Sequence, residues 1–323
     1  MQKSTRNIVL ASAAVAGASA LGMMYHTSAK NLVKLALDRE QPKNIQKGRA
    51  WLTGARDIEA FLKKAKETSK VLESKNLERV EIKGRDGITL VGHWQECQSP
   101  KRVIIAMHGW RSSWSQDFGM ISEFWIKSNC SVLYAEQRGQ GESGGEYMGF
   151  GLLERYDCLE WSKWAAKRTD SKLPIYLGGV SMGATTVLMT AGLALPEEVK
   201  GIVADCGFTS PRDIWRHVAQ RNLHIPYGIY NAAANDMCKK KIHFESDEYS
   251  TLDAMKVCPV PVLFVHGTDD HFVPIEMTYE NFKACRAPKH LLVVPGAEHG
   301  LSYFINKDRY EQAFRDFWER YDG

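Results

Sequence analysis

The sequence predicts an α/β fold, with a mostly parallel, eight-stranded sheet, helices on both faces and an inserted cap. From about residue 77, short apolar runs rich in β-branched residues alternate with longer stretches of helical spacing. Such alternation is typical of a parallel sheet covered by helices. One connection, from about residue 205 to 261, is far longer than an ordinary link between a strand and a helix. It predicts the cap.

The first two apolar runs differ from the other six. They alternate apolar with polar residues and are separated by a turn containing Asp86-Gly87, so we expect an antiparallel hairpin. The later runs are continuously apolar, as expected of strands covered on both faces. The expected strands are at 80–82, 88–91, 103–107, 132–135, 175–177, 201–204, 262–265 and 291–294. The expected helices between and after them are at about 114–128, 151–168, 182–195, 275–285 and 308–321.

The chain divides into three parts. Residues 1–29 contain an apolar stretch at 8–25, which predicts a secretory signal or a membrane anchor. Residues 30–75 have helical spacing and predict a helical extension packed on the main domain. Residues 76–323 form the α/β domain, with the cap insertion at about 208–255. Ligands of open α/β sheets bind beyond the carboxyl ends of the strands, where this insertion begins.

The apolar segment at 8–25 predicts that the protein is membrane-anchored or exported, and we favour an uncleaved anchor over a cleaved signal. Lysine and arginine residues both precede and follow the segment, so the positive-inside rule selects no orientation.

Composition excludes two other classes of protein. The 323 residues carry a net charge of +4 that is spread along the chain, which argues against a nucleic-acid partner. The seven cysteines form no C-x-x-C pair, which argues against a disulfide framework and against a zinc site. We therefore expect the cysteines to be packing residues and expect no metal.

A nucleophile motif follows the strand at 175–177. The residues Gly179-Val180-Ser181-Met182-Gly183 match G-x-S-x-G, and they lie between that strand and the following helix, as the motif requires. The turn is strained, and a side chain at Gly179 or Gly183 would collide with the neighbouring strand or helix. A helix N-cap serine is the alternative interpretation of Ser181.

The acid and base are expected after Ser181, because the chain order for this motif is Ser, then Asp or Glu, then His. Asp270 follows the strand at 262–265, and His299 follows the strand at 291–294. Both loops leave the same sheet edge as Ser181, so we expect His299 to be the base and Asp270 to orient it. Asp269 is the closest alternative acid, and Asp205 is a weaker one. His266 and His271 are expected to hold the Asp270 loop.

An oxyanion hole requires one backbone N–H after the nucleophile and one from the loop after an earlier strand. Met182 and Trp110 occupy these positions, the latter within His108-Gly109-Trp110-Arg111. We also expect Trp110, Trp215 and Tyr227 to line the substrate pocket, although packing of the cap is the alternative role for the last two. Arg111 is expected to form a surface ion pair rather than to bind an anionic substrate.

These segments together resemble the α/β-hydrolase superfamily over about residues 77–323. The chain is similar to bacterial serine-aminopeptidase-like and acylglycerol-lipase-like hydrolases that carry an N-terminal signal or anchor. The resemblance implies hydrolysis of an ester, thioester or amide through an acyl-enzyme, with no metal or organic cofactor. One supporting segment departs from the family pattern, because residues 136–143 begin with Glu136 rather than Asp and have Gln140 in place of His. We expect this segment to brace the sheet edge without affecting activity.

The leading hypothesis is a carboxylesterase or lipase-like enzyme whose partner is a small-molecule acyl ester. An amide or peptide hydrolase, or an acyltransferase, would use the same three residues. A non-catalytic binding protein on this fold is the remaining alternative. An aspartate nucleophile, as in dehalogenases and epoxide hydrolases, is excluded by Ser181.

Overall fold

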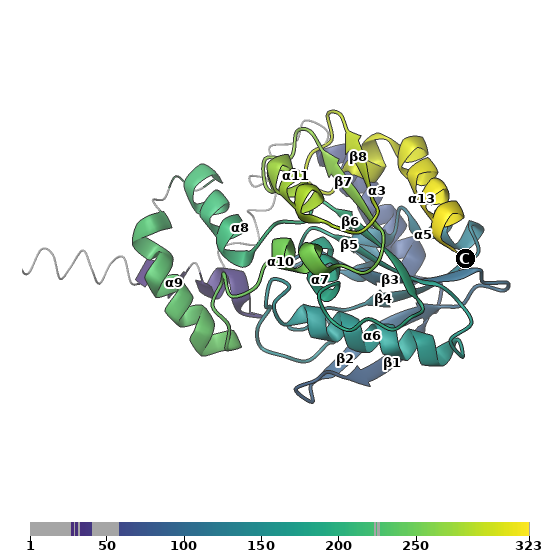
Figure 1. Cartoon of the computed structure of the whole chain (residues 1–323), viewed down its shortest axis with the longest axis horizontal. Coiled ribbons are helices and arrows are strands. Elements are labelled where there is room, and N and C mark those ends of the chain that lie inside the picture. The colour runs from purple at the N-terminus through teal and green to yellow at the C-terminus, as the bar shows by residue number, and fades with distance from the viewer. Residues whose placement is uncertain are drawn as a thin grey trace, which may run out of the picture.

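In the computed structural model, eight strands form one sheet (Figure 1). The structure describes residues 27–28, 30–31, 33–40, 58–222, 224 and 227–322. The strands are β1 (Glu78–Lys83), β2 (Thr89–Gln95), β3 (Arg102–Met107), β4 (Cys130–Ala135), β5 (Ile175–Val180), β6 (Val199–Asp205), β7 (Val262–Gly267) and β8 (Lys289–Val294). Each lies on a run from which the sequence predicts a strand.

The strand order is β1-β2-β4-β3-β5-β6-β7-β8. The expected hairpin is confirmed, because β1 pairs antiparallel with β2, and β2 also pairs antiparallel with β4. All other neighbours are parallel, so the carboxyl ends of β3 and β5 to β8 lie at one edge. The expectation that every later strand is covered on both faces is wrong for β8. It is the last strand in the order, and Leu291 there is 36% exposed.

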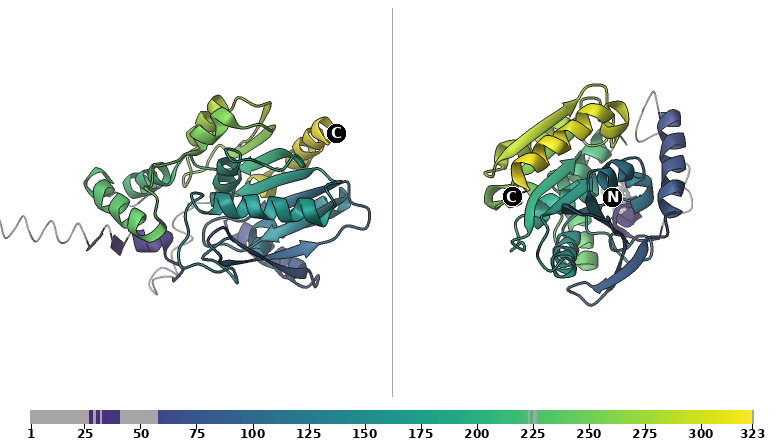
Figure 2. Two further views of the ribbon diagram at one scale, coloured as in Figure 1. Left: turned by 60° about the horizontal axis from the view of Figure 1, so that its bottom comes forward. Right: turned by 90° about the vertical axis from the view of Figure 1, so that its right-hand side faces the viewer.

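Helices cover both faces of the sheet (Figure 2). Their bounds are α3 (Ile58–Glu73), α4 (Trp114–Phe118), α5 (Ser122–Lys127), α6 (Glu154–Arg168), α7 (Met182–Thr190), α8 (Pro211–His217), the π-helical turn η1 (Val218–Asn222), α9 (Tyr227–Ile242), α10 (Thr251–Val257), α11 (Ile275–Ala284), α12 (Ser302–Ile305) and α13 (Lys307–Tyr321). One face packs on α6, α7, α10 and α11 around Trp161 and Val187. The other face packs on α3, α4, α5 and α13 around Trp125 and Phe314.

The helix expected at 114–128 is two short helices. α4 ends before Gly119, and α5 begins at Ser122. A Cβ atom on Gly119 would lie 2.8 Å from the backbone nitrogen of Ser69 in α3. The interruption therefore lets the N-terminal extension approach the backbone of this segment closely.

The long connection after β6 contains four helical elements. α8 and α9 project away from the sheet (Figure 1). α10, by contrast, buries Ala254 and Met255 in the core together with Val187 of α7. The projecting cap therefore consists of α8 to α9, and the last part of the insertion belongs to the helical layer.

The N-terminal extension contacts the main domain at two places. Residues 27–40, here called the N-terminal segment, bury Val33 and Leu37 against a cluster that includes Met182 and Met237. Helix α3 buries Leu72 in the cluster that also contains Trp125 and Phe314. The apolar stretch at 8–25 lies outside the described residues. Among the helices that the structure describes, none has the length and apolar character of a membrane span.

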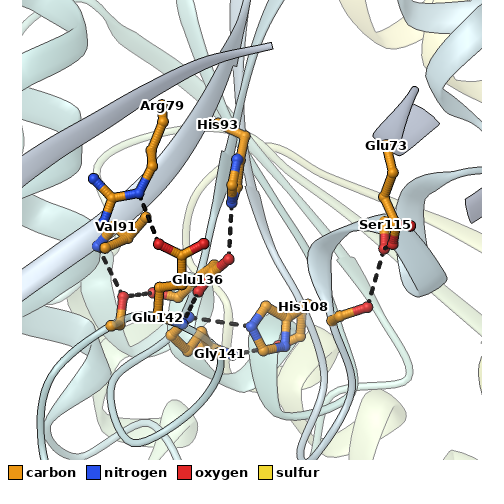
Figure 3. Close-up of polar contacts among 12 residues, drawn as sticks. Glu73, Arg79, Val91, His93, His108, Ser115, Glu136, Gly141 and Glu142 are labelled. Carbon is orange, nitrogen blue, oxygen red and sulfur yellow. Dashed lines mark hydrogen bonds and ion pairs between the residues drawn. The ribbon is translucent and has the colours of Figure 1, made fainter. Parts of the chain in front are cut away.

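The segment around Glu136 joins the sheet edge to the loops behind the site (Figure 3). The Glu136 carboxylate lies 2.8 Å from His93 Nε2 of β2 and accepts a hydrogen bond from the backbone N–H of Glu142. Ser143 Oγ accepts from the backbone N–H of Val91 at 2.8 Å. These contacts fix the turn to β2, which is the bracing role that we expect from the sequence.

Arg138 makes the buried part of this brace. Its guanidinium donates two hydrogen bonds to Asp157 at 2.6 Å, and the side chains of Arg138 and Asp157 are 5% and 2% exposed. We expect Arg138→Ala to lower the free energy of unfolding by about 3–5 kcal/mol, because the Asp157 carboxylate stays buried without its partner. Urea unfolding measures this. Lys163→Ala, which breaks an exposed pair with Glu160, is the control, with an expected change of about 0.5 kcal/mol or less. A loss of stability for Arg138→Ala as small as that of the control would contradict the stabilising role of the buried Arg138–Asp157 pair.

Candidate active site

Ser181 occupies a strained turn between β5 and α7. Its φ is 56° and its ψ is −118°, a backbone conformation that few residues other than glycine adopt. A Cβ atom on Gly179 would lie 2.3 Å from the carbonyl of Gly183, and a Cβ on Gly183 would lie 1.8 Å from the carbonyl oxygen of Met107. The steric reason predicted for both glycines is therefore confirmed.

The structure brings Ser181, Asp270 and His299 together at the carboxyl edge of the sheet. His299 Nε2 lies 2.9 Å from Ser181 Oγ, and His299 Nδ1 lies 2.7 Å from Asp270 Oδ2. Asp270 follows β7, and His299 follows β8, which lies beside β7 in the sheet. One imidazole thus contacts both the hydroxyl and the carboxylate.

The two alternative acids lie elsewhere in the hydrogen-bond network. Asp269 is exposed, and its carboxylate accepts a hydrogen bond from Thr268 Oγ1 at 2.6 Å. Asp205 is buried and accepts from Ser302 Oγ at 3.0 Å. Asp270 is the carboxylate within hydrogen-bond distance of His299.

The Asp270 carboxylate is held on both oxygens. Oδ1 accepts from the backbone N–H groups of Phe272 and Val273 at 2.9 and 2.8 Å. Oδ2 lies 3.1 Å from His266 Nε2, and His266 Nδ1 lies 2.7 Å from Thr278 Oγ1. His266 is fully buried, so it holds this loop, as its position in the sequence predicts. These contacts fix the direction from which Asp270 meets His299.

The electrostatics of the pair favour a charged carboxylate beside the imidazole. Burial would raise the pKa of Asp270, but the charge and hydrogen bonds of His299 and His266 outweigh burial and hold that pKa well below its usual value. Burial would lower the pKa of His299, but the Asp270 charge outweighs it and raises that pKa well above 6.5. Asp270 therefore stabilises an imidazolium form of His299.

The two predicted oxyanion donors, the backbone N–H groups of Met182 and Trp110, come shortly after β5 and β3. Met182 is the first residue of α7, so its N–H has no acceptor within the helix. Trp110 follows β3, and the N–H of the preceding Gly109 is already donated to Asp117 Oδ2 at 2.7 Å. His108 supports this loop from behind, because its Nε2 accepts the backbone N–H of Gln137 at 3.1 Å. That these two amides bind an oxyanion stays a prediction.

Comparison with protein families matches residues 116–323 to the prolyl oligopeptidase family. The chain belongs to the prolyl oligopeptidase family. The match contains Ser181, Asp270 and His299, whereas α3, the N-terminal segment and Trp110 lie before it. Family and fold together place the chain in the α/β-hydrolase superfamily and support a serine hydrolase in general.

The chain is also similar to a bacterial protein and shares its fold with solved structures. The chain is 27% identical to YqkD of Bacillus subtilis over 187 residues, which are 58% of this chain and 61% of that protein. An esterase of Pyrococcus furiosus, Pf2001, shares the fold with a TM-score of 0.63 at 23% identity, covering 77% of this chain and 93% of that one. An acylaminoacyl peptidase shares it with a TM-score of 0.56 at 16% identity, covering 79% and 43%. The chain therefore spans less than two thirds of the Bacillus relative, and the narrower resemblance to serine-aminopeptidase-like and acylglycerol-lipase-like enzymes stays a prediction.

Among the described residues, one group of potential metal ligands lies at the Ser181 site. Cys206, Asp270 and His299 have potential ligand atoms within 4.8 Å of one another. Burial raises the pKa of the Cys206 thiol to about 11, so it is protonated at neutral pH. Because a thiolate is the form that binds metals, and His299 is already bound to Asp270 and Ser181, the donor set is a poor fit for a metal.

Ser181 and His299 line a cavity of about 640 Å³. Trp110 lines it as predicted, but the prediction for Trp215 is wrong. The Trp215 ring packs on Phe150, with ring centroids 5.3 Å apart, inside the cluster beneath the cap. Tyr227 begins α9, and its side chain lies outside the described part of the chain. Seven residues of α3, which sequence reasoning did not assign to the site, line the cavity instead, and their helical spacing alone gave no signal of this.

The N-terminal segment holds the loop that carries Trp110. The Trp110 indole N–H donates to the carbonyl oxygen of Ala36 at 2.9 Å. The Arg111 guanidinium donates to the carbonyl oxygens of Leu35 and Asp38 at 2.9 and 2.6 Å. Arg111 itself has a φ of 51°, an uncommon value for a residue with a side chain. The contacts described for Arg111 are thus to backbone carbonyl oxygens, and they fix the loop next to Ser181.

Proposed function

We propose that the protein is a carboxylesterase that cleaves an ester through a covalent acyl-enzyme. Ser181 is the nucleophile, His299 the general base and acid, and Asp270 the group that orients His299. The proposal is carried by one observation, the imidazole of His299 within 2.9 Å of Ser181 Oγ and 2.7 Å of Asp270 Oδ2 in the wall of a cavity. Nucleophile, base and orienting acid in mutual contact are the arrangement that activates a serine hydroxyl.

The reaction follows from where the protons lie. His299 donates a hydrogen bond from its Nδ1–H to the Asp270 carboxylate, which leaves Nε2 free to accept the hydroxyl proton of Ser181 as Oγ attacks the ester carbonyl. The tetrahedral intermediate collapses when the His299 imidazolium gives that proton to the leaving alkoxide, which departs as an alcohol. Water then attacks the acyl-enzyme by the same two proton transfers and releases a carboxylic acid. Asp270 stays ionised throughout and stabilises the imidazolium.

The negative charge that develops on the carbonyl oxygen is bound by the backbone N–H groups of Met182 and Trp110. Each such donor contributes about 2.7–4 kcal/mol of transition-state stabilisation in related chemistry. The start of α7 is also the positive end of its helix dipole, which stabilises the same negative charge. Both donors act through the backbone, so their positions depend on the neighbours that hold the loop and the helix.

Arg111 positions one of these donors. We expect Arg111→Ala to lower kcat about tenfold, with little change in KM. This loss is smaller than the ~10²–10³-fold loss of kcat that follows removal of an oxyanion donor. Steady-state kinetics on an ester measures both constants, and added guanidinium is expected to restore part of kcat. Lys241→Ala is the control, because it breaks a 2.7 Å ion pair with Asp38 of the same segment without touching the Trp110 loop. Equal losses in the two variants would mean that docking of the segment, rather than Arg111, sets kcat.

A second candidate function is peptide or amide hydrolysis with the same residues, and membership of the prolyl oligopeptidase family favours it. The discriminating experiment compares p-nitrophenyl esters and p-nitroanilides that carry identical acyl groups. We expect ester turnover at rates that Ser181→Ala removes, with slow or no anilide turnover. Faster cleavage of the anilide than of the matched ester would overturn the esterase proposal in favour of the peptidase.

The apolar stretch at 8–25 leads us to propose that the enzyme is attached to a membrane by an uncleaved anchor. Cell fractionation of the full chain and of a form lacking residues 1–29 tests this. We expect the full chain in the membrane pellet at its full mass and the shortened form in the supernatant. If the protein expressed from the full-length sequence is instead recovered lighter by about the mass of the leader, a cleaved signal is supported.

A further inference from the structure

The cavity that contains Ser181 runs along one face of α3. Its lining residues on this helix recur at the spacing of a single stripe: Phe61, Leu62, Ala65, Lys66, Ser69, Lys70 and Glu73. With a rise of 1.5 Å per residue, the stripe from Phe61 to Glu73 is about 18 Å long. The cavity is therefore elongated. Its volume of about 640 Å³ lies within the ~300–1,000 Å³ that ligand sites occupy.

A row of aromatic side chains from α4, α5, α12 and α13 also lines the cavity. Phe118 and Trp125 have ring centroids 5.5 Å apart, and Trp125 and Phe314 are 6.5 Å apart. Tyr310 continues the row at 5.3 Å from Phe314, and Tyr303 lies 5.4 Å from Tyr310. All five residues line the cavity. The ligand therefore meets mostly apolar surface along this side.

Two small residues of α3 leave the middle of the cavity open. Ala65 and Ser69 are one turn apart and are 7% and 6% exposed. Gly178 of β5 also lines the cavity. A Cβ atom on Gly178 would meet only ordinary contacts, the nearest being Ile104 Cγ2 at 3.7 Å. Larger side chains at Ala65 or Gly178 would therefore enter the cavity.

α3 is held in place as a wall of this cavity. Ser115 Oγ donates to the Glu73 carboxylate at 2.6 Å (Figure 3). Ser69 Oγ donates to Ser115 Oγ at 2.9 Å. At the other end of the helix, Phe61 packs edge-on against Phe304 at 5.7 Å. Both ends of the stripe are thus attached to the main domain.

The charges of the lining favour an uncharged ligand. The two lysines of the described lining, Lys66 and Lys70, are exposed to solvent. Asp117 accepts hydrogen bonds from Gly109 and Ser112, and Asp205 accepts from Ser302. The buried part of the lining thus has carboxylates but no lysine or arginine that would bind an anionic group.

We propose that this cavity binds the acyl part of the substrate as an extended, uncharged aliphatic chain, and that α3 limits the chain length. The inference rests on the proposed esterase function and adds its substrate class. An elongated space between a helix and a row of rings is filled by an extended chain, whereas a compact ring leaves most of it empty. α3 lies before the part of the chain that matches the family, so this specificity belongs to the extension of this protein.

The test is a chain-length profile with p-nitrophenyl acetate, butyrate, octanoate, dodecanoate and palmitate on the full-length enzyme. We expect kcat/KM for the octanoate or dodecanoate to exceed that for the acetate at least about tenfold, because each buried methylene adds binding energy. In Ala65→Phe we expect this advantage to disappear while acetate hydrolysis stays within about threefold of wild type.

Two further variants make the result specific to the cavity. Gly178→Val enters the cavity from the sheet and is expected to reproduce the loss on long chains. Lys64→Phe places the same side chain as Ala65→Phe on the exposed face of α3, and we expect a wild-type profile. Acetate turnover in every variant reports that the protein is folded and that Ser181 still reacts.

The outcomes separate the inference from the proposed function. If wild type favours acetate, or if Ala65→Phe and Gly178→Val both keep the wild-type profile, the acyl site is wrong although the esterase proposal stands. If wild type hydrolyses no ester and a fluorophosphonate does not label Ser181, the proposed function itself fails. A long-chain advantage that both cavity variants remove and Lys64→Phe retains supports the inference.

Discussion

Ser181→Ala is expected to lower kcat on a carboxylic ester about 10⁶-fold, the scale found when the nucleophile of a serine hydrolase is removed. Alanine cannot form the acyl-enzyme, so only binding and the oxyanion donors remain to act on the substrate. The measurement is ester hydrolysis by purified wild type and variant, with circular dichroism and thermal unfolding to compare their folds. Alanine tolerates the positive φ of this position no worse than serine, so the variant is expected to be folded.

Comparing wild type with Ser181→Ala is decisive because Ser181 Oγ is the proposed nucleophile. Residual activity within about tenfold of wild type, in a variant with unchanged unfolding temperature, would show that another group forms the covalent bond. A pre-steady-state burst of p-nitrophenol in wild type and its absence in the variant would support the acyl-enzyme step.

Asp270→Asn is expected to lower kcat about 10⁴-fold while the protein keeps its fold. Asparagine can donate from its amide nitrogen, which would favour the wrong tautomer of His299 and place a proton on the nitrogen that must accept one from Ser181. Steady-state kinetics measures the loss. Asp269→Asn is the matched control, because Asp269 is adjacent in sequence but exposed and bound to Thr268. A similar loss in both variants would mean that the loop, and not the Asp270 carboxylate, matters.

Wild type and Asp270→Asn are also expected to differ in the pH dependence of kcat/KM. Burial disfavours the His299 imidazolium, but Asp270 outweighs burial and raises the pKa of His299 above 6.5. Because the protonated ring cannot accept the Ser181 proton, kcat/KM of wild type should fall as the pH is lowered through this raised pKa. Asp270→Asn removes the stabilising charge, so its acid limb should lie at lower pH. An acid limb at the same pH in wild type and Asp270→Asn would contradict the assigned interaction.

The fold and the three central side chains could be predicted because their signals are local. Each strand is a short apolar run, and Ser181 has glycines on both sides whose absent side chains are sterically required. Asp270 and His299 each follow a strand, and parallel strands bring their carboxyl ends to one edge. Local pattern and shared edge together determine which residues meet. The sequence alone did not decide whether Asp269 or Asp270 contacts His299. The conformation of the turn decides it, because there the Asp270 carboxylate accepts from the N–H groups of Phe272 and Val273.

The walls of the cavity could not be predicted, because they depend on packing between distant segments. α3 has the helical spacing of any surface helix, and nothing in it indicates that Ala65 and Ser69 line the cavity that contains Ser181. Its place is set by the contact of its backbone with Gly119 and by Ser115, which follow in a different element. Trp215 is a large aromatic residue of the kind that often lines a pocket, but its ring packs against Phe150 instead of lining the cavity that contains Ser181. Arg111 likewise binds carbonyl oxygens of a segment far earlier in the sequence.

The most direct test of the central claim is to map a fluorophosphonate adduct on the full chain by mass spectrometry. The proposed mechanism predicts one adduct, on Ser181, and a labelling rate at least about 100-fold lower in His299→Ala, which lacks the base. An adduct on another residue, or an undiminished labelling rate in His299→Ala, would contradict activation of the Ser181 hydroxyl by His299.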